Sequence, residues 1–198
     1  MVKTPNSTKC APHKGSFQAW IIWVLSALFL FYKYVIEVSP SVMTQPLMAT
    51  YSIDGAALGS LAAAYFYAYL ALQIPAGLLI DRVGPRLMTT VAILLCALGS
   101  LLFGLSRSFS MAMVGRFLTG MGASFAALNC LKLIANWFPH KRFAFMAGLM
   151  MTVGMLGAAG GQAPLASYIE RVGWRNSLES FSIFGVVLAG LFWIFVRD

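Results

Sequence analysis

The amino-acid sequence predicts an all-α integral membrane protein with six transmembrane helices. Only 10% of its residues are charged, whereas soluble domains carry about 25%, and its mean hydropathy is +0.79. The apolar residues form long runs, each supplying the ~20 residues that cross the hydrocarbon core of a bilayer. These runs lack the alternation of barrel strands, so helices are the structure that satisfies their backbone polar groups in lipid.

Breaks between the apolar runs set the bounds of the six predicted helices. The first run ends at Ser39-Pro40-Ser41, and a loop is expected from there to Asp54. Charged or polar turns separate the later runs. The predicted helices cover residues 17–38, 55–80, 87–105, 109–137, 143–169 and 177–196, and together they form one transmembrane domain over 17–196.

Residues 1–16 are polar and basic and are predicted to form a cytoplasmic tail. A cleaved signal peptide is the alternative. The apolar run from Phe17 is too long for the core of a signal peptide, and no small-residue cleavage site follows it. We therefore expect this run to be an uncleaved first helix.

The basic residues predict that both termini are cytoplasmic. With the N-terminus inside, eight basic residues fall on the cytoplasmic side and three on the outer side, in agreement with the positive-inside rule. The first set is Lys3, Lys9, Lys14, Arg82, Arg86, Lys141, Arg142 and Arg197, and the second is Arg107, Arg171 and Arg175. The net charge of +8 therefore belongs to short loops and tails, so we expect the lipid bilayer as a partner and no nucleic acid.

The sequence predicts no cofactor, no metal site and no enzyme. The three cysteines lack metal-ligand spacing, and both histidines lie outside the predicted helices. An intramembrane serine protease of the rhomboid type would need a Gly-x-Ser-Gly motif and a histidine within a helix. Here Ser124 is followed by Phe125, so that alternative is excluded.

An internal repeat relates the two halves of the transmembrane domain. A shift of 89 residues places Gln73 on Gln162 and Asp81 on Glu170. The shared pattern, Gln-x-Pro-x5-acid-Arg-Val-Gly-x-Arg, occupies residues 73–86 and 162–175. Each copy contains three helices, an odd number, so the two copies have opposite orientations. Two inverted three-helix repeats are typical of secondary transporters.

Four motifs, in the same order, resemble signatures of the major facilitator superfamily. Gly77-x3-Asp81-Arg82-x-Gly84-x-Arg86 resembles the signature between helices 2 and 3, with Pro85 where the family often has a base. Residues 115–123 resemble the Arg-x3-Gly-x-Gly signature of helix 4, residues 136–142 the loop between helices 4 and 5, and residues 173–175 the next loop. Together they cover nearly the whole chain.

Two further segments bear on the type of transporter. The glycine-rich part of the fifth helix lacks the Gly-Pro-x-x-Gly-Gly motif of drug/proton antiporters, because Pro164 comes later, so we do not expect antiport of that kind. Tyr34-x-x-Glu37-x-x-Pro40-Ser41 is similar to bacterial relatives of the peptide carriers of lysosomes. The expected location is therefore a bacterial inner membrane.

The resemblance implies the N-terminal six-helix half of a transporter, with the C-terminal six-helix half absent from these residues. It implies transport of a small polar or charged organic solute by alternating access, with or without proton coupling. A cavity with both charge signs suits an amino acid, a peptide or an organic anion. The alternative is a non-transporting fragment, or a half-module that assembles with a second half or a second copy.

The resemblance also implies that the turn after the second helix is a cytoplasmic latch. Asp81 would contact an arginine and the start of another helix, and so hold the outward-open state. The latch set is Gly77, Asp81, Arg82, Gly84 and Arg86, and the repeat-related set in the outer loop is Glu170, Arg171, Gly173 and Arg175.

Three ionisable residues within the predicted helices are the main candidates for substrate binding or proton coupling. Lys33 and Glu37 are four residues apart on one helix face, and Arg116 enters the fourth helix from the same side of the membrane. We expect a charged cluster, in which Glu37 binds a proton or Arg116 holds a substrate carboxylate by bidentate bonding. Snorkelling of Lys33 and Glu37 to the interface is the alternative.

Polar residues elsewhere in the helices are secondary candidates. Tyr65, Tyr69 and Gln73 share one face of the second helix, Asn129 lies centrally in the fourth, and Gln162 is the repeat mate of Gln73. These groups either line the substrate path or bond neighbouring helices together, which is the commoner use. Lys132, near the cytoplasmic end of the fourth helix, is expected to snorkel.

Overall fold

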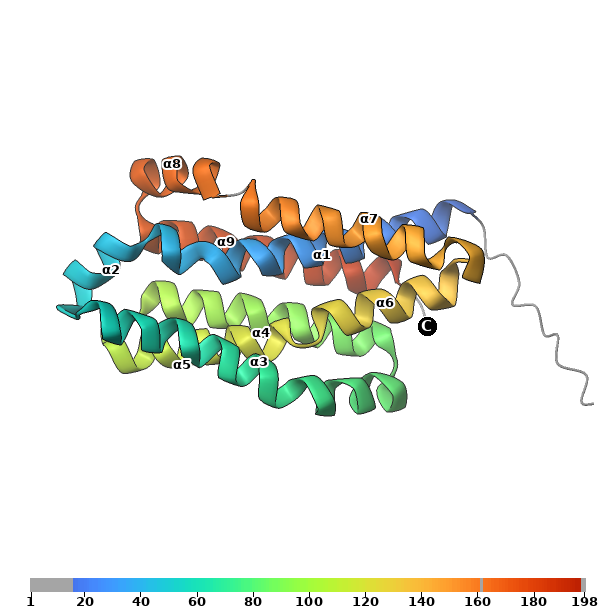
Figure 1. The fold of residues 1–198 in the computed structure, drawn as a ribbon, viewed down its shortest axis with the longest axis horizontal. Helices are drawn as coiled ribbons and strands as arrows, with labels where there is room; N and C mark the ends of the chain where they lie inside the picture. Colours follow the sequence, from blue (N-terminus) through green and yellow to red (C-terminus); the bar gives the residue numbers. More distant parts are fainter. Residues whose placement is uncertain (1–15, 161, 197–198) are drawn as a thin grey trace, which may run out of the picture.

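The computed structural model describes residues 16–160 and 162–196, which fold into a bundle of antiparallel helices (Figure 1). Within these ranges six helical segments are long and apolar enough to cross a membrane, as the sequence predicts. They are Phe17–Val42, Gly55–Val83, Pro85–Leu105, Phe109–Trp137, His140–Ala159 and Trp174–Phe195. Residues 1–15 of the predicted tail, and Arg197, lie outside the described residues.

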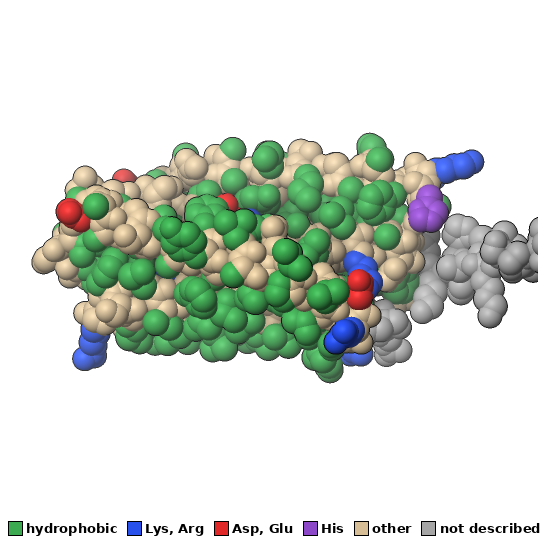
Figure 2. Space-filling view, turned by 60° about the horizontal axis from the view of Figure 1, so that its bottom comes forward, with side chains coloured by type: hydrophobic (Ala, Val, Ile, Leu, Met, Phe, Trp, Pro, Cys, Tyr) green, Lys and Arg blue, Asp and Glu red, His purple; other side chains and the backbone are tan. Residues whose placement is uncertain are grey.

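The surface of the bundle fits a lipid environment. Figure 2 shows hydrophobic side chains along the middle of the face in view and charged side chains mainly toward the two ends. Large apolar side chains such as Ile74, Phe145 and Ile183 are mostly exposed. A long apolar surface of this kind is expected to contact lipid acyl chains or another apolar surface, because its exposure to water would be unfavourable.

The first span is longer than predicted, and the loop after it contains a helix. Helix α1 (Ser16–Val42) continues through Pro40, and α2 (Thr44–Tyr51) follows it within the expected loop. Helix α2 ends at Ser52, which has a left-handed backbone (φ 52°), and the Ile53 amide donates to the Met48 carbonyl at 3.2 Å. This is a common way to end a helix. With eight residues, α2 cannot span a membrane.

The turn between the second and third spans is shorter than predicted. Helix α3 (Gly55–Val83) begins with Asp54 as its cap, whose carboxylate accepts from the Ala57 amide at 2.8 Å. Helix α3 continues past Ile80, so Asp81 and Arg82 lie in its last turn rather than in a loop. Helix α4 (Pro85–Leu105) starts one residue after Gly84, with a proline in the position where its missing N–H costs nothing.

The fourth span has the predicted bounds, Phe109–Trp137, but a short break divides it into two helices. Helix α5 (Phe109–Ala123) and helix α6 (Ala126–Trp137) are separated at Ser124 and Phe125. The Ser124 hydroxyl donates to the Met121 carbonyl at 2.7 Å, and the Phe125 amide donates to the Gly122 carbonyl at 3.3 Å. These bonds replace the regular helical pattern for one turn.

The fifth span also consists of two helices, so the single helix predicted over 143–169 is wrong. Helix α7 (His140–Ala159) is the part that can cross a membrane, and α8 (Gln162–Val172) is a short amphipathic helix. Pro164 falls in the first turn of α8, where its missing N–H breaks no helical bond. Helix α9 (Trp174–Phe195) completes the bundle and starts three residues before its predicted start.

The repeat is visible in the backbone. Gly84 and Gly173, which are repeat mates, have φ angles of 97° and 88°, which few other residues tolerate. Each is followed by an arginine that bonds the far end of a neighbouring helix. Arg86 donates to the Trp193 carbonyl of α9 at 2.7 Å, and Arg175 donates to the Gly104 and Ser106 carbonyls at the end of α4, at 3.0 and 2.7 Å. The antiparallel pair α4–α9 is therefore tied at both ends.

The first helix of each repeat packs with the other repeat. Helix α1, from the first repeat, packs against α7 and α9 of the second, while α5, from the second repeat, packs against α3 and α4 of the first. Figure 1 shows the resulting two groups of helices, with α1, α7 and α9 above and α3, α4 and α5 below. This exchange places the polar residues of α1 and α5 next to one another.

Close packing of α5 on α3 depends on Gly120. A Cβ atom there would lie 2.2 Å from the Tyr65 carbonyl oxygen, so we expect Gly120→Ala to destabilise the bundle by about 1–3 kcal/mol. Gly148 in α7 has nothing within 4 Å of its Cβ position, so Gly148→Ala should be neutral or stabilise by up to ~1 kcal/mol. Unfolding by sodium dodecyl sulfate in mixed micelles measures both variants. Equal stabilities would contradict the packing argument.

Candidate functional site

Lys33 and Glu37 form an ion pair inside the bundle. They are one helical turn apart on α1, and the Lys33 ammonium contacts the Oε2 atom of Glu37. The side chain of Lys33 is 7% exposed and that of Glu37 19%. Both heads are held within the bundle by side chains of other helices, so the snorkelling alternative does not describe this conformation.

Aromatic rings surround the Lys33 ammonium. Its nitrogen lies 4.0 Å from the ring centroid of Tyr34 and 5.1 Å from that of Tyr69 on α3. Ring faces attract a cation, and they do so more strongly where water is excluded. Tyr69 is in turn stacked on Tyr65, with ring centroids 6.3 Å apart. The tyrosines of α3 thus form one wall of the charged cluster.

Arg116 reaches from α5 to the backbone of α1. Its guanidinium is fully buried and donates to the carbonyls of Ile36, at 3.0 Å, and Glu37, at 3.3 Å. Pro40 explains why the first of these carbonyls needs a donor, because a proline has no N–H for the carbonyl four residues earlier. The Ser39 hydroxyl donates to the same oxygen at 2.9 Å. Arg116 therefore stabilises the proline-containing turn that carries Glu37.

The expected cluster of Lys33, Glu37 and Arg116 is thus present, but its bonding differs from the expectation. The guanidinium bonds the backbone beside Glu37 through both of its terminal nitrogens, while its Nε atom is buried without a hydrogen-bond partner among the described residues. Bidentate binding of a substrate carboxylate by Arg116 stays a prediction.

The cluster has an excess of positive charge. Lys33 and Arg116 are the buried cations of the described chain, and one carboxylate, that of Glu37, lies beside them. A buried charge without a counterion is costly in a low-dielectric environment. The arrangement can therefore attract one further negative charge.

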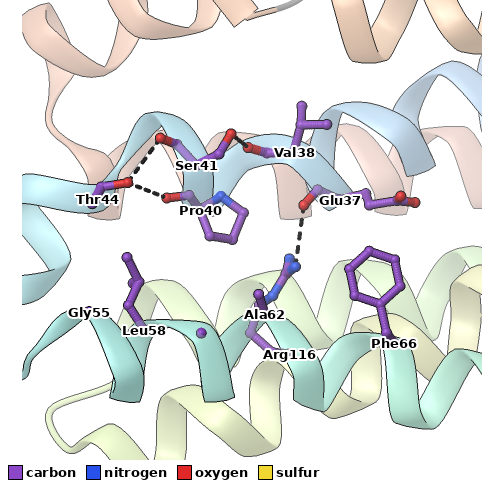
Figure 3. Close-up of a pocket in the computed structure, with 11 residues that line it drawn as sticks. Glu37, Val38, Pro40, Ser41, Thr44, Gly55, Leu58, Ala62, Phe66 and Arg116 are labelled. Carbon is purple, nitrogen blue, oxygen red and sulfur yellow. Dashed lines mark hydrogen bonds between the residues drawn. The ribbon is translucent and has the colours of Figure 1, made fainter.

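A groove leads to the cluster between α1 and α3. Its volume is ≈ 480 Å³, and Figure 3 shows the Arg116 side chain reaching across it to Glu37. The wall on α3 is apolar and includes Leu58, Ala62 and Phe66, whereas Ser41 and Thr44 supply hydroxyls on the opposite wall. The groove thus joins the charged cluster to the end of the bundle at which α2 lies.

Comparison with known proteins shows the family to which the chain belongs. Residues 19–198 match the family model described as the Major Facilitator Superfamily. The chain belongs to this superfamily. It is 27% identical, over 86% of its length, to a probable sulfoacetate transporter of Cupriavidus necator, and 29% identical, over 85%, to a probable L-galactonate transporter of Escherichia coli. It spans 40% and 38% of those two relatives, respectively.

A solved structure of the same superfamily fold resembles the bundle. It is the crystal structure of a bacterial homologue of the human lysosomal transporter Spinster, in an inward-facing and unoccupied conformation. The TM-score is 0.84 over 93% of this chain and 44% of that one, at 16% identity. The likeness confirms the fold. The narrower resemblance of residues 34–41 to carriers of this kind stays a prediction, because such an identity shows the fold alone.

The superfamily motif at the end of α3 forms a different contact from the one implied by the resemblance. Asp81 pairs with Lys132 of α6, rather than with an arginine, and Lys132 also donates to the Ile80 carbonyl at 3.4 Å. Lys132 is thus an ion-pair partner and does not simply snorkel. Arg82 is exposed, and Arg86 joins α4 to α9 instead of contacting Asp81 in the bonds described above.

The remaining candidates are dispersed. Gln73 donates to the Tyr69 hydroxyl at 3.1 Å, so it belongs to the tyrosine wall, and Gly77 follows one turn later on α3.

Asn129 is fully buried in α6, and neither of its side-chain polar atoms has a partner among the described residues. Gln162 is exposed at the start of α8 and has no hydrogen bond to the cluster. In the outer-loop set, Glu170 and Arg171 are exposed, and Gly173 and Arg175 have the structural roles described above.

Sequence reasoning missed two features of the site. One is the role of Arg116 toward the backbone, and the signal for it is Pro40, since a proline within an apolar helix leaves a carbonyl that needs a donor. The other is the pairing of Lys132 with Asp81. A lysine within a span, with no acid within four residues, indicates a partner on another helix.

The bond between Arg116 and the carbonyl left free by Pro40 can be tested by a double-mutant cycle. Arg116→Gln should destabilise the bundle by about 1.5–3 kcal/mol, because it removes charge-assisted bonds from buried carbonyls. In a Pro40→Ala background the residue at position 40 again has an N–H that can bond the Ile36 carbonyl. The destabilisation caused by Arg116→Gln should then be smaller by about 1 kcal/mol. Unfolding in micelles measures the cycle, and an equal cost in both backgrounds would refute the assignment.

Proposed function

We propose that this chain is the N-terminal half of a secondary transporter that moves a small organic anion by alternating access. The observation that supports it most is the buried cluster, in which two cations face one carboxylate. An anionic group of a substrate would complete the charge balance at Lys33, where the tyrosine rings provide an apolar wall. The names of the two relatives, sulfoacetate and L-galactonate transporters, also refer to organic acids.

Within this proposal, Glu37 is the proton-sensitive member of the cluster. An anion that pairs with Lys33 displaces the carboxylate of Glu37 from its cation, and a carboxylate that loses its counterion binds a proton more readily. Uptake of the anion and binding of a proton are then linked at neighbouring atoms. Transport without a proton is the alternative, in which Glu37 only keeps Lys33 paired between cycles.

The orientation proposed from the basic loops places both termini in the cytoplasm and the α2 end outside. The groove then opens toward the outer side, and the Asp81–Lys132 pair lies near the cytoplasmic side. The relatives named above come from bacteria, which supports a bacterial inner membrane as the location. The remainder of the substrate path would come from a second six-helix half, or from a second copy of this chain if it assembles as a half-module.

Transport assays on the complete reading frame that contains these residues test the proposal. In reconstituted vesicles, Lys33→Gln should lower kcat/KM for the anion at least tenfold, a loss of about 1.4 kcal/mol of binding in the transition state, because the cation that receives the substrate is gone. Lys33→Arg should retain part of the activity. Lys141→Gln, at an exposed position in the first turn of α7, is the matched control and should behave like the wild type.

Two results would count against this function. One is normal uptake by Lys33→Gln at equal membrane abundance. The other is equal competition by an anion and by its neutral amide, since a site with one excess positive charge should prefer the anion. A protein that is monomeric and takes up neither would support the non-transporting alternative.

We propose further that the Asp81–Lys132 pair is the cytoplasmic latch. Asp81→Asn should change the rate at which a cysteine at Gln73 is labelled from the cytoplasmic side, by up to about fivefold, since the Asp81 side chain is 71% exposed and exposed pairs contribute at most ~1 kcal/mol. The change would be a shift in the population of conformations rather than a loss of substrate binding. Arg82→Gln is the control, and identical labelling of the Asp81→Asn variant and this control would refute the latch.

A further inference from the structure

Tyr65 connects three spans through one buried side chain. It is 0% exposed, and its hydroxyl donates to the Oε2 atom of Glu37 at 3.0 Å. The Arg116 guanidinium lies 4.8 Å from the centre of its ring, and Tyr69 stacks on it. The residue itself belongs to α3, so it joins this helix to the carboxylate of α1 and the guanidinium of α5.

The position of this side chain is set by the backbone as well. Gly120 brings α5 so close that an added Cβ would lie 2.2 Å from the Tyr65 carbonyl and 3.1 Å from the Cβ of Ala68. Densely packed elements of this kind do not deform gradually. The hydroxyl can therefore leave Glu37 only if α3 and α5 move away from α1, or if Glu37 itself moves.

The hydrogen bond from Tyr65 to Glu37 lies beside the groove, because Glu37 is part of the groove lining. Figure 3 shows the walls on α1 and α3 facing each other, with Ala62 and Phe66 on α3 opposite Glu37. Tyr65 lies on the same helix, between those two residues in sequence, and its hydroxyl reaches Glu37. The hydrogen bond therefore connects α1 and α3 where the groove between them ends.

Lys33 and Tyr65 contact the same oxygen atom. The ammonium and the hydroxyl both reach Oε2 of Glu37. A hydrogen bond to an ionised carboxylate is about twice as strong as one between neutral groups. The groups around Glu37 are Lys33 and Tyr34 from α1, Tyr65 and Tyr69 from α3, and Arg116 from α5, so Tyr65 is the neutral donor that remains if Lys33 turns to another anion.

We propose that Tyr65 is a positioning residue, which holds the ionised Glu37 beside Lys33 and ties α3 to α1 until Glu37 takes up a proton. Protonation weakens the bond, because a carboxylic acid is a poorer acceptor than a carboxylate. The charge state of Glu37 therefore determines how firmly α3, the helix that also carries Asp81, is bonded to α1. The role in the transport cycle rests on the proposed function, whereas the tie between the two helices does not.

Tyr65→Phe removes the hydroxyl and keeps the ring. In the complete protein, a cysteine at Gly59, in the groove wall, should then react about fivefold faster with a maleimide, because α3 separates from α1 more often. The pH profile of uptake should also differ from that of the wild type, because the Glu37 carboxylate has lost a hydrogen-bond donor. Tyr67→Phe, on the same helix with a 70% exposed ring, is the matched control and should change neither measurement.

A second arm separates positioning from packing. In a Glu37→Gln background the charge-assisted bond is already lost, so Tyr65→Phe should add little to the labelling rate at Gly59→Cys. Glu37→Gln alone should raise that rate as Tyr65→Phe does, which tests the tie even if the phenylalanine variant fails to reach the membrane. If both substitutions leave labelling at the rate of Tyr67→Phe, the proposal is wrong.

The outcomes also separate this proposal from the proposed function. A wild-type protein that takes up no anion at any pH would refute the transport proposal, and labelling at Gly59→Cys would still decide the role of Tyr65. Normal uptake with unchanged labelling in Tyr65→Phe would refute the positioning role alone. Faster labelling that persists fully in the Glu37→Gln background would also refute it, because ring packing would then be the cause.

Discussion

The contact between Arg116 and the Ile36 carbonyl is the interaction on which the polar centre of the bundle depends. Pro40 leaves that carbonyl without its helical donor, because a proline has no N–H. A guanidinium from α5 supplies the bond and in doing so brings a buried positive charge next to Glu37. The bonds of Arg116 to the α1 backbone fix the turn that carries Glu37. They also place a second buried cation beside the Lys33–Glu37 pair, which gives the cluster its excess of positive charge.

The glycines and arginines of the two repeat turns also satisfy backbone carbonyls, one turn at each end of the bundle. Gly84 and Gly173 provide left-handed turns, and Arg86 and Arg175 satisfy carbonyls at opposite ends of the α4–α9 pair. The repeat is not symmetric in its ion pairs, however. Asp81 has Lys132 as a partner, whereas its mate Glu170 is exposed on α8 and has no ion pair among the described residues. Of the two repeat turns, only the one at the end of α3 therefore carries an ion pair among the described residues.

Much of the fold follows from the sequence because apolar run length and basic loop residues report directly on the membrane. The six spans and the cluster of Lys33, Glu37 and Arg116 were predictable in this way. The interruptions after Ala123 and Ala159 were not, because hydropathy does not register a local change of hydrogen bonding in an apolar stretch. The bonds of Arg116 and Lys132 were also missed, since a span examined alone shows a charge but not the helix that will face it.

The exchange of first helices between the repeats has a consequence for how the chain is made. Helix α1 is made before the other described helices, and the helices that cover it follow much later: α7 begins about a hundred residues after α1 ends, and α9 later still. Lys33 and Glu37 are one turn apart, so they can pair within α1 before α7 and α9 are made. Neither three-helix repeat can bury its own first helix, so the smallest unit that can complete its packing is the set of six.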